Sequence, residues 1–189
     1  MNNLIQLNKE RKTIDESYFD NYGGGDYSDT YLNYTYHPKN VINQFYSRGI
    51  YFNTLLDAGC ATGELVRDFR KLGIKAYGIE NNLEALKNSV VPNYITYGDI
   101  RFLDHIEDNT FEVIYVNSCM YLKPKEILPC LKGFHRICSR AVFLCNPFLG
   151  DTKIDSDPYR KFLAKPSWWE KQFKEASFTK ISKNIYIKK

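Results

Sequence analysis

The feature that most constrains the fold is a short apolar run that ends in an acid and passes into a turn of small residues. It reads LLDAGCATG over residues 55–63, and a second acid, Glu80, follows further along. Such strand–turn–helix units are typical of parallel sheets that hold nucleoside-containing cofactors at their carboxyl edge. The run therefore predicts an α/β protein with a cofactor site at the end of its first strand.

Segments in which apolar residues have the spacing of a strand are followed along the chain by segments in which they have the spacing of a helix. Strands are predicted over residues 54–57, 75–80, 94–97, 111–117 and 141–145. Helices are predicted over residues 39–48, 63–72, 83–89 and 124–137, and Ser167 is expected to cap another. Residues 178–187 are expected to add one or two strands as an antiparallel edge. This order predicts a doubly wound, mainly parallel sheet of about seven strands with helices on both faces.

The first residues differ in composition from the rest. Residues 1–17 are polar and expected to be loose at the start, and residues 18–36 crowd six tyrosines around three glycines. We therefore predict an N-terminal tail and tyrosine-rich cap over residues 1–38, followed by a single domain over 39–189. Tyr22, Tyr36 and His37 are candidates for contacts with a substrate, and His37 could act as a base because its unperturbed pKa is near neutrality. The alternative is surface packing of the tyrosines and a turn role for the histidine.

Charge and cysteine content narrow the function classes. The net charge is +4, and residues 151–189 hold ten Lys or Arg against five Asp or Glu. A solvated lysine-rich face is favoured over a nucleic-acid contact there. The five cysteines are odd in number and lack C-x-x-C spacing, which argues against disulfides and structural zinc, so no metal is predicted. No apolar run approaches the roughly 20 residues of a membrane span, and no signal-peptide core is seen, so a cytoplasmic protein without a membrane partner is expected.

Three acids are predicted at the ends of three neighbouring strands: Asp57, Glu80 and Asp99. A carboxylate after the second strand can accept ribose hydroxyls, and one after the third can accept an adenine amino group. Glu64 stands where a dinucleotide fingerprint needs its third glycine, and Asp57 would repel a pyrophosphate. A nicotinamide-dependent oxidoreductase is therefore disfavoured, and a cationic ligand such as a sulfonium with an amino group is favoured.

Four runs, LLDAGCATGELV, AYGIENN, YGDI and FEVIYVNSCMYL, closely resemble the class I (Rossmann-like) S-adenosylmethionine-dependent methyltransferases. The resemblance extends from about residue 39 to the end. It implies a methyltransferase-like domain with S-adenosylmethionine as cofactor and S-adenosylhomocysteine as product. The implied cofactor contacts are Asp57 at the amino end; Gly59, Cys60, Ala61 and Gly63 around the methionine part; Glu80 and Asn81 at the ribose; Asp99 and Ile100 at the adenine; and Asn117 and Ser118 beside the methyl group. Ala61 departs from the family's frequent glycine but is small enough for binding to survive.

The sequence does not identify the methyl acceptor. The N-P-P-Y loop of base amino-methylating enzymes is absent, because residues 117–120 read NSCM. Cys119 and Cys145 stand at strand ends, where a carbon-5 nucleophile is needed, but the expected proline is missing and cysteine is common in cores. A small-molecule or saccharide acceptor is slightly favoured over RNA. A non-catalytic methyltransferase-like partner subunit is the other alternative, and the oligomeric state is not predicted.

Overall fold

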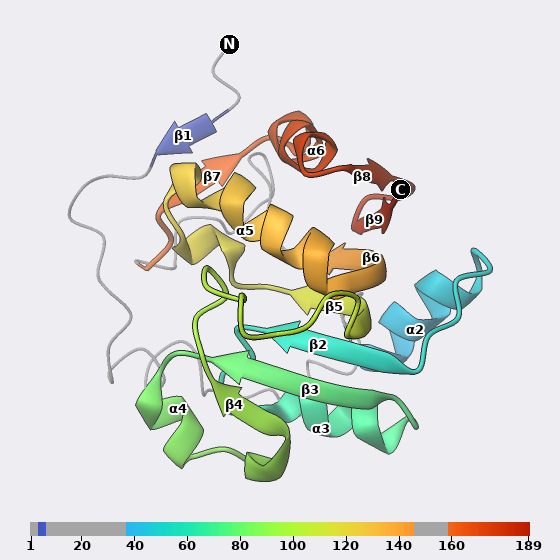
Figure 1. Cartoon of the computed structure of the whole chain (residues 1–189), viewed down its shortest axis with the longest axis vertical. Coiled ribbons are helices and arrows are strands. Elements are labelled where there is room, and N and C mark those ends of the chain that lie inside the picture. Colours follow the sequence, from blue (N-terminus) through green and yellow to red (C-terminus); the bar gives the residue numbers. More distant parts are fainter. Residues whose placement is uncertain (1–3, 7–36, 146–158) are drawn as a thin grey trace.

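A seven-stranded sheet forms the centre of the molecule. A computed structural model describes residues 4–6, 37–145 and 159–189 (Figure 1). The sheet has the order β4-β3-β2-β5-β6-β9-β8, with β2 to β6 parallel and β9 antiparallel to both of its neighbours. The strands are β2 (Thr54–Ala58), β3 (Lys75–Glu80), β4 (Ile95–Tyr97), β5 (Phe111–Val116), β6 (Cys138–Leu144), β8 (Phe178–Lys180) and β9 (Ile185–Lys188). The predicted doubly wound, mainly parallel sheet is confirmed, including its antiparallel edge.

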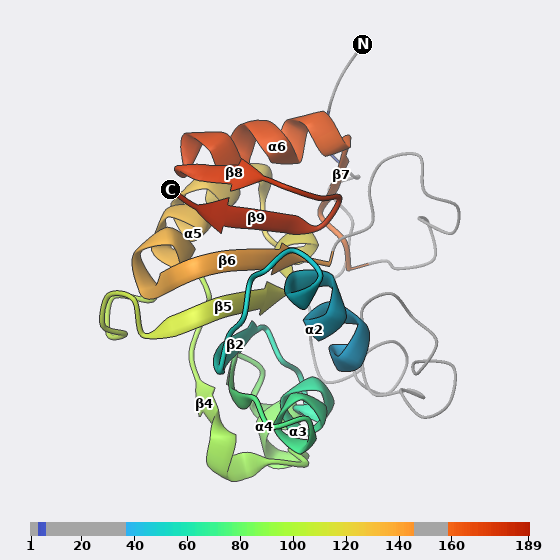
Figure 2. The same ribbon diagram turned by 90° about the vertical axis from the view of Figure 1, so that its right-hand side faces the viewer.

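Helices cover both faces of this sheet (Figure 2). They are α2 (Pro38–Tyr46), α3 (Glu64–Lys71), α4 (Leu83–Lys87), α5 (Pro124–Ile137) and α6 (Pro166–Glu175), with 3-10 turns η3 (Pro92–Tyr94) and η4 (Cys119–Tyr121). One buried cluster joins α2 and α3 to the sheet, and a second joins α5 and α6 to it. None of the helices in the described part of the chain is long and apolar enough to cross a membrane.

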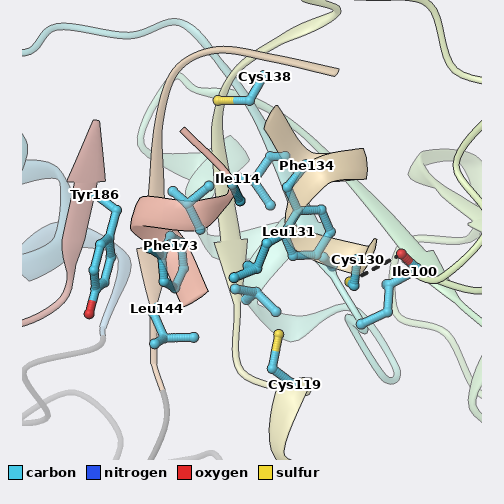
Figure 3. Close-up of a cluster of buried hydrophobic side chains, with 14 of the residues drawn as sticks. Ile100, Ile114, Cys119, Cys130, Leu131, Phe134, Cys138, Leu144, Phe173 and Tyr186 are labelled. Carbon is cyan, nitrogen blue, oxygen red and sulfur yellow. Dashed lines mark hydrogen bonds between the residues drawn. The ribbon is translucent and has the colours of Figure 1, made fainter. Parts of the chain in front are cut away.

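The buried cluster on the α5–α6 side includes Ile100, which follows β4 (Figure 3). Leu131 and Phe134 of α5 are fully buried in this cluster, and Phe173 stacks on Tyr186 with ring centroids 3.7 Å apart. The Cys130 thiol donates a hydrogen bond to the Ile100 carbonyl at 3.3 Å. Helix α5 is therefore attached directly to the segment that follows β4.

The start of β6 differs from the prediction. This strand begins at Cys138 rather than residue 141, and its register against β5 shifts between Phe111 and Val113. Ser139 and Arg140 are exposed, so the apolar pattern that marks a buried strand begins only after them. Ser139 and Arg140 lie in this irregularity and contact β5 through their side chains, at the Phe111 carbonyl and Oε1 of Glu112, which a local pattern does not reveal.

Two other local predictions need correction. Residues Leu4–Gln6, expected to be loose, form β1 and pair antiparallel with β7 (Phe162–Ala164), which was not predicted. Ser167 does not cap α6, because the helix begins at Pro166 and Lys165 is the capping position. Proline is favoured at the first helical position, where its missing N–H costs nothing.

Candidate cofactor-binding site

The turn after β2 requires glycine at two positions. Gly59 and Gly63 have φ angles of +80° and +90°, in the left-handed region that side chains disfavour. A Cβ atom on Gly59 would also collide with the side chain of Ser118. One on Gly63 would lie 2.8 Å from Cγ2 of Val91 and collide with Ile95. The turn is thus packed tightly between β4 and the residues after β5, with its backbone close to the sheet edge.

Asp57 lies at the base of this turn. Its side chain is buried, and Oδ2 has no hydrogen-bond partner among the described residues. Burial, followed by the charges of Glu80 and Glu64, raises the pKa of Asp57 to about 8. A buried carboxyl oxygen without a partner is costly, and a cationic ligand at this place would relieve that cost. The predicted preference for a cationic ligand therefore fits the geometry.

Glu80 ends β3 and holds the neighbouring turns. Its Oε2 accepts the N–H of Ala61, and its Oε1 accepts the N–H groups of Asn81 and Asn82, each at 2.9 Å. Burial raises the pKa of Glu80, and the three backbone donors act in the opposite direction. Oε2 keeps acceptor capacity for a further donor, which is compatible with the expected ribose contact.

Asn82 was missed by the sequence analysis. Its side-chain oxygen caps α4 by accepting the N–H groups of Glu84 and Ala85 at 2.8 and 3.1 Å. An asparagine directly before an apolar helical pattern is the local signal that could have revealed this cap. The cap and the Glu80 contacts together fix the loop between β3 and α4.

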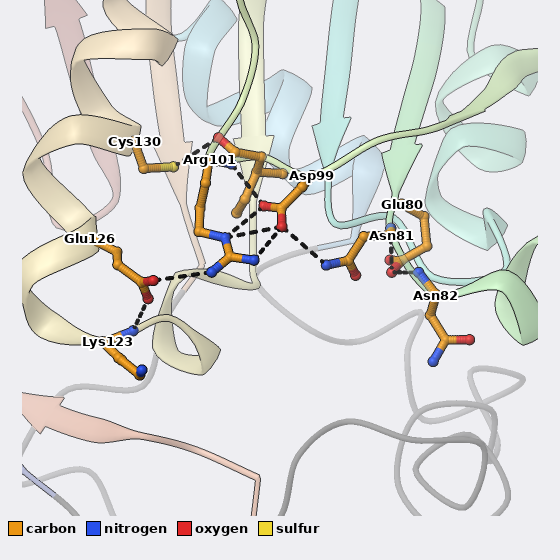
Figure 4. A network of polar contacts seen from close by, with 9 residues as sticks. Glu80, Asn81, Asn82, Asp99, Arg101, Lys123, Glu126 and Cys130 are labelled. Carbon is orange, nitrogen blue, oxygen red and sulfur yellow. Dashed lines mark hydrogen bonds and ion pairs between the residues drawn. The ribbon is translucent and has the colours of Figure 1, made fainter.

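Asp99, beyond the end of β4, belongs to a polar network (Figure 4). Oδ1 accepts the backbone N–H and Nε of Arg101 at 2.9 and 3.0 Å, and Oδ2 accepts Nη2 of the same arginine. Oδ2 also has a long contact of 3.5 Å with Nδ2 of Asn81. Burial raises the pKa of Asp99, but the Arg101 hydrogen bonds outweigh it, so the pKa is lowered overall. Arg101 was missed because nothing local marks a cation two residues after an acid as its partner.

The remaining described candidates lie at the same edge. Ile100 is buried beside α5, and Asn117 is exposed directly after β5. Ser118 donates from Oγ to the Ala58 carbonyl at 2.7 Å, joining the ends of β2 and β5. Cys60 is buried, and its thiol packs against Gly78 of β3. The structure therefore gathers the predicted cofactor residues at the carboxyl ends of β2, β3, β4 and β5.

Of the three candidates for substrate contact, only His37 lies within the residues that the structure describes. Tyr22 and Tyr36, with most of the predicted cap, lie outside the described residues. His37 caps α2, with Nδ1 accepting the N–H of Lys39 at 3.3 Å. That interaction gives the histidine a structural role and leaves its expected role as a base a prediction.

The cysteines are buried. Burial raises the pKa of Cys145 to about 12, and the Cys119 side chain is fully enclosed in the α5 side of the core. A nucleophilic thiol is normally exposed and has a lowered pKa. Within the described ranges, no group of three or more His, Cys, Asp or Glu side chains could hold a metal ion.

Comparison with known proteins identifies the family. The family model described as methionine biosynthesis protein MetW matches residues 40–155, more than half of the chain. The chain belongs to the MetW family. The match includes the turn after β2 and the ends of β3, β4 and β5, so the candidate site lies within the MetW region. A search of curated proteins found no match.

Solved structures show the same fold as this MetW-family chain. An S-adenosylmethionine-dependent methyltransferase from Archaeoglobus fulgidus matches with a TM-score of 0.64 and 16% identity, over 82% of this chain and 76% of that one. Magnesium protoporphyrin IX methyltransferase from Synechocystis PCC 6803, solved with bound S-adenosylmethionine, gives 0.63 and 14%, over 92% and 94%. A protein in complex with the Haloferax volcanii Trm112 methyltransferase activator gives 0.59 and 14%, over 69% and 63%.

These likenesses confirm the class I methyltransferase fold predicted from the sequence. S-adenosylmethionine is bound in the Synechocystis structure and named for the Archaeoglobus enzyme. The chain spans just under two thirds of the Trm112-bound protein's length.

Proposed function

We propose that this MetW-family chain binds S-adenosylmethionine at the carboxyl edge of its sheet and transfers the methyl group to a small-molecule or saccharide acceptor. The observation that carries the proposal is Asp57, a buried carboxyl with an unpartnered oxygen at the base of a left-handed glycine turn. An ammonium group would supply the missing hydrogen-bond donor and favour the ionised carboxylate, whose charge would repel a phosphate.

Each part of the cofactor has a matching group in the chain. Asp57 attracts the amino end, and the turn from Gly59 to Gly63 lets the backbone surround the methionine part. Glu80 accepts ribose hydroxyls with Asn81 beside it, and Asp99 with Ile100 holds the adenine. Asn117 and Ser118 border the methyl group. The observed burial and hydrogen bonds of Glu80 and Asp99 support this assignment, because their oxygens are held in place before any ligand binds.

For methyl transfer, the protein mainly has to align the acceptor with the methyl group of the cofactor. The cofactor supplies a methyl group on a positively charged sulfur, an activated donor for in-line displacement. The chain fixes the site by joining the ends of β2 and β5 through Ser118 and Ala58. Such positioning lowers the barrier by removing the entropy cost of bringing two reactants into line. No strong base is needed for an acceptor that is already nucleophilic.

A small acceptor is favoured because the thiols needed for carbon-5 methylation of pyrimidines are buried. The fold neighbour from Synechocystis is named for a small-molecule acceptor, magnesium protoporphyrin IX. An RNA acceptor and a non-catalytic partner subunit remain the alternatives that the experiment separates.

Titration calorimetry with S-adenosylhomocysteine, with NAD as the control ligand, tests the cofactor assignment. We expect binding of S-adenosylhomocysteine alone, and weaker binding by the Asp57→Asn variant. Binding of NAD alone, or of neither ligand, would contradict the proposal. Methyl transfer from radiolabelled S-adenosylmethionine to panels of small molecules, saccharides and RNA then tests turnover. Cofactor binding without transfer to any acceptor would favour the partner subunit.

A further inference from the structure

We infer that Arg101 is a positioning residue that makes the site selective for a purine with a 6-amino group. The inference rests on the proposed function, because it concerns the adenine end of the same site. Arg101 does not belong to the predicted cofactor contacts, and it acts through Asp99.

The contact between the side chains of Asp99 and Arg101 is close and bidentate. Nε of Arg101 lies 3.0 Å from both oxygens of Asp99, and Nη2 forms an ion pair with Oδ2. The backbone N–H of Arg101 adds a third donor to Oδ1 at 2.9 Å. A planar guanidinium fixes a carboxylate in orientation as well as in charge, which a lysine cannot do.

The donors that contact Asp99 determine which of its oxygen lone pairs can accept a hydrogen bond from a ligand. A carboxylate offers two lone pairs on each oxygen. Oδ1 accepts the backbone N–H and Nε of Arg101, and Oδ2 accepts Nε and Nη2 of Arg101 together with the 3.5 Å contact of Asn81. That long contact is the weakest of the set and the one that a ligand amino group can replace. Arg101 therefore holds both oxygens of Asp99 in place, and the Asn81 contact on Oδ2 is the one that a ligand amino group can take over.

Arg101 is itself anchored from the other side. Its Nη1 donates to Oε1 of Glu126 at 3.0 Å, and Oε2 of Glu126 accepts the N–H of Lys123 at 2.7 Å. Glu126 lies in the first turn of α5, the helix whose Cys130 also contacts the Ile100 carbonyl (Figure 4). The arginine thus connects a fixed helix end to the carboxylate, and a solvent-exposed pair without such an anchor would contribute little.

An analogue that replaces the 6-amino group with a 6-oxo group, and therefore carries a proton on N1, tests this effect. S-adenosylhomocysteine has a 6-amino group that donates to a carboxylate, whereas S-inosylhomocysteine has a 6-oxo group that repels it. A site built to accept a donor rejects the analogue lacking it strongly, so we expect the unaltered protein to prefer S-adenosylhomocysteine by at least about a hundredfold. In Arg101→Gln we expect this preference to fall by about tenfold, chiefly through weaker binding of the adenine ligand. Arg101→Lys should fall between the two.

The matched control is Arg140→Gln, which removes a similar ion pair of 3.0 Å with Glu112 at the opposite edge of the sheet. It should leave both affinities unchanged. Calorimetry with both ligands and thermal denaturation are measured for all variants. A parallel loss of both affinities in Arg101→Gln would show a merely structural role, and an unchanged preference would show no role; either overturns the inference. If the unaltered protein binds neither ligand, the proposed function fails first, and the inference fails with it.

Discussion

The Oε2 atom of Glu80 accepts the backbone N–H of Ala61 at 2.9 Å, so the acid that ends β3 holds the turn that follows β2. Ala61 has a φ angle of +50°, and its N–H points at the carboxylate from a left-handed conformation. One side chain therefore shapes the loop that would surround the methionine part of the cofactor while standing where the ribose is expected. Binding and local stability should be coupled at this position.

Glu80→Gln tests that coupling. The glutamine amide would set its NH2 against a backbone N–H, since both oxygens of Glu80 accept such donors. We expect a loss of about 1–3 kcal/mol in the free energy of unfolding and a similar loss in binding of S-adenosylhomocysteine. Chemical denaturation and calorimetry measure the two effects.

Glu112→Gln is the matched control for this variant. Oε2 of Glu112 accepts the N–H groups of Asn53 and Thr54 at 2.6 and 3.1 Å, away from the carboxyl edge. Stability should fall while the affinity for S-adenosylhomocysteine stays constant. Unchanged affinity in Glu80→Gln would remove Glu80 from the binding site.

Ala61→Gly should stabilise the protein. The left-handed conformation costs a non-glycine residue about 1–2 kcal/mol, and glycine loses about 0.4–1 kcal/mol through a freer unfolded chain. The net gain in the free energy of unfolding should be up to about 1.6 kcal/mol, measured by denaturation. Ala85→Gly, within α4, serves as the control and should lose about 1 kcal/mol. A loss of stability in Ala61→Gly would contradict the strain argument.

Gly59→Ala and Gly73→Ala separate backbone strain from close packing. Both glycines have positive φ angles, +80° and +86°, but an added Cβ meets Ser118 at the first position and nothing within 4 Å at the second. We expect Gly73→Ala to cost about 1 kcal/mol in the free energy of unfolding. Gly59→Ala should cost about 1–3 kcal/mol more and weaken binding of S-adenosylhomocysteine. Equal losses in the two variants would show that Gly59 is needed only for its backbone.

The parts of this structure that sequence reasoning predicted are those with local signals. Strands β2 and β5 are rich in buried apolar residues, and β2 and β3 each have an acid at or next to their last residue, so parallel pairing was enough to bring Asp57 and Glu80 together. The glycine turn was predicted for ligand approach, and the structure adds close packing against Ser118 as a second reason.

The parts that were missed depend on partners far apart in the sequence. Strands β1 and β7 are three residues each and form only by pairing with one another across the chain. Arg101 has an unremarkable local context, and its anchor Glu126 lies on another element. The role of a short edge strand or a single charged residue depends on its contacts with distant parts of the chain. The periodicity of apolar residues carries no information about those contacts.

Cys119→Ser should retain methyl transfer. The thiol is fully buried, so the variant should lose about 1–3 kcal/mol of stability by placing a hydroxyl in an apolar core. Cys138→Ser, also buried on the α5 side, is the control. Once folded, both variants should transfer methyl groups at rates similar to the unaltered protein, measured with radiolabelled S-adenosylmethionine. A Cys119→Ser variant that binds S-adenosylhomocysteine but transfers nothing, beside an active Cys138→Ser, would support carbon-5 chemistry.

Asp57 should make both stability and binding depend on pH. Its pKa is raised from 3.8 to about 8, chiefly by burial, so between these values the folded, unliganded protein holds a proton that the unfolded chain releases. The stabilising contribution is therefore present below pH 4 and is lost as pH rises through 8. Relative to Asp57→Asn, the free energy of unfolding should fall by up to about 1.4 kcal/mol per pH unit across this window.

Binding should show the opposite trend over the same window. An ammonium group favours the ionised carboxyl, so each bound S-adenosylhomocysteine should displace up to one proton from Asp57 below pH 8. The affinity should rise with pH by up to about tenfold per unit between pH 5 and 8, and the rise should be much smaller in Asp57→Asn. Calorimetry in buffers of different ionisation enthalpy counts the released protons directly. Equal pH dependence in both proteins would show that Asp57 does not meet the amino end of the ligand, because its proton would then play no part in binding.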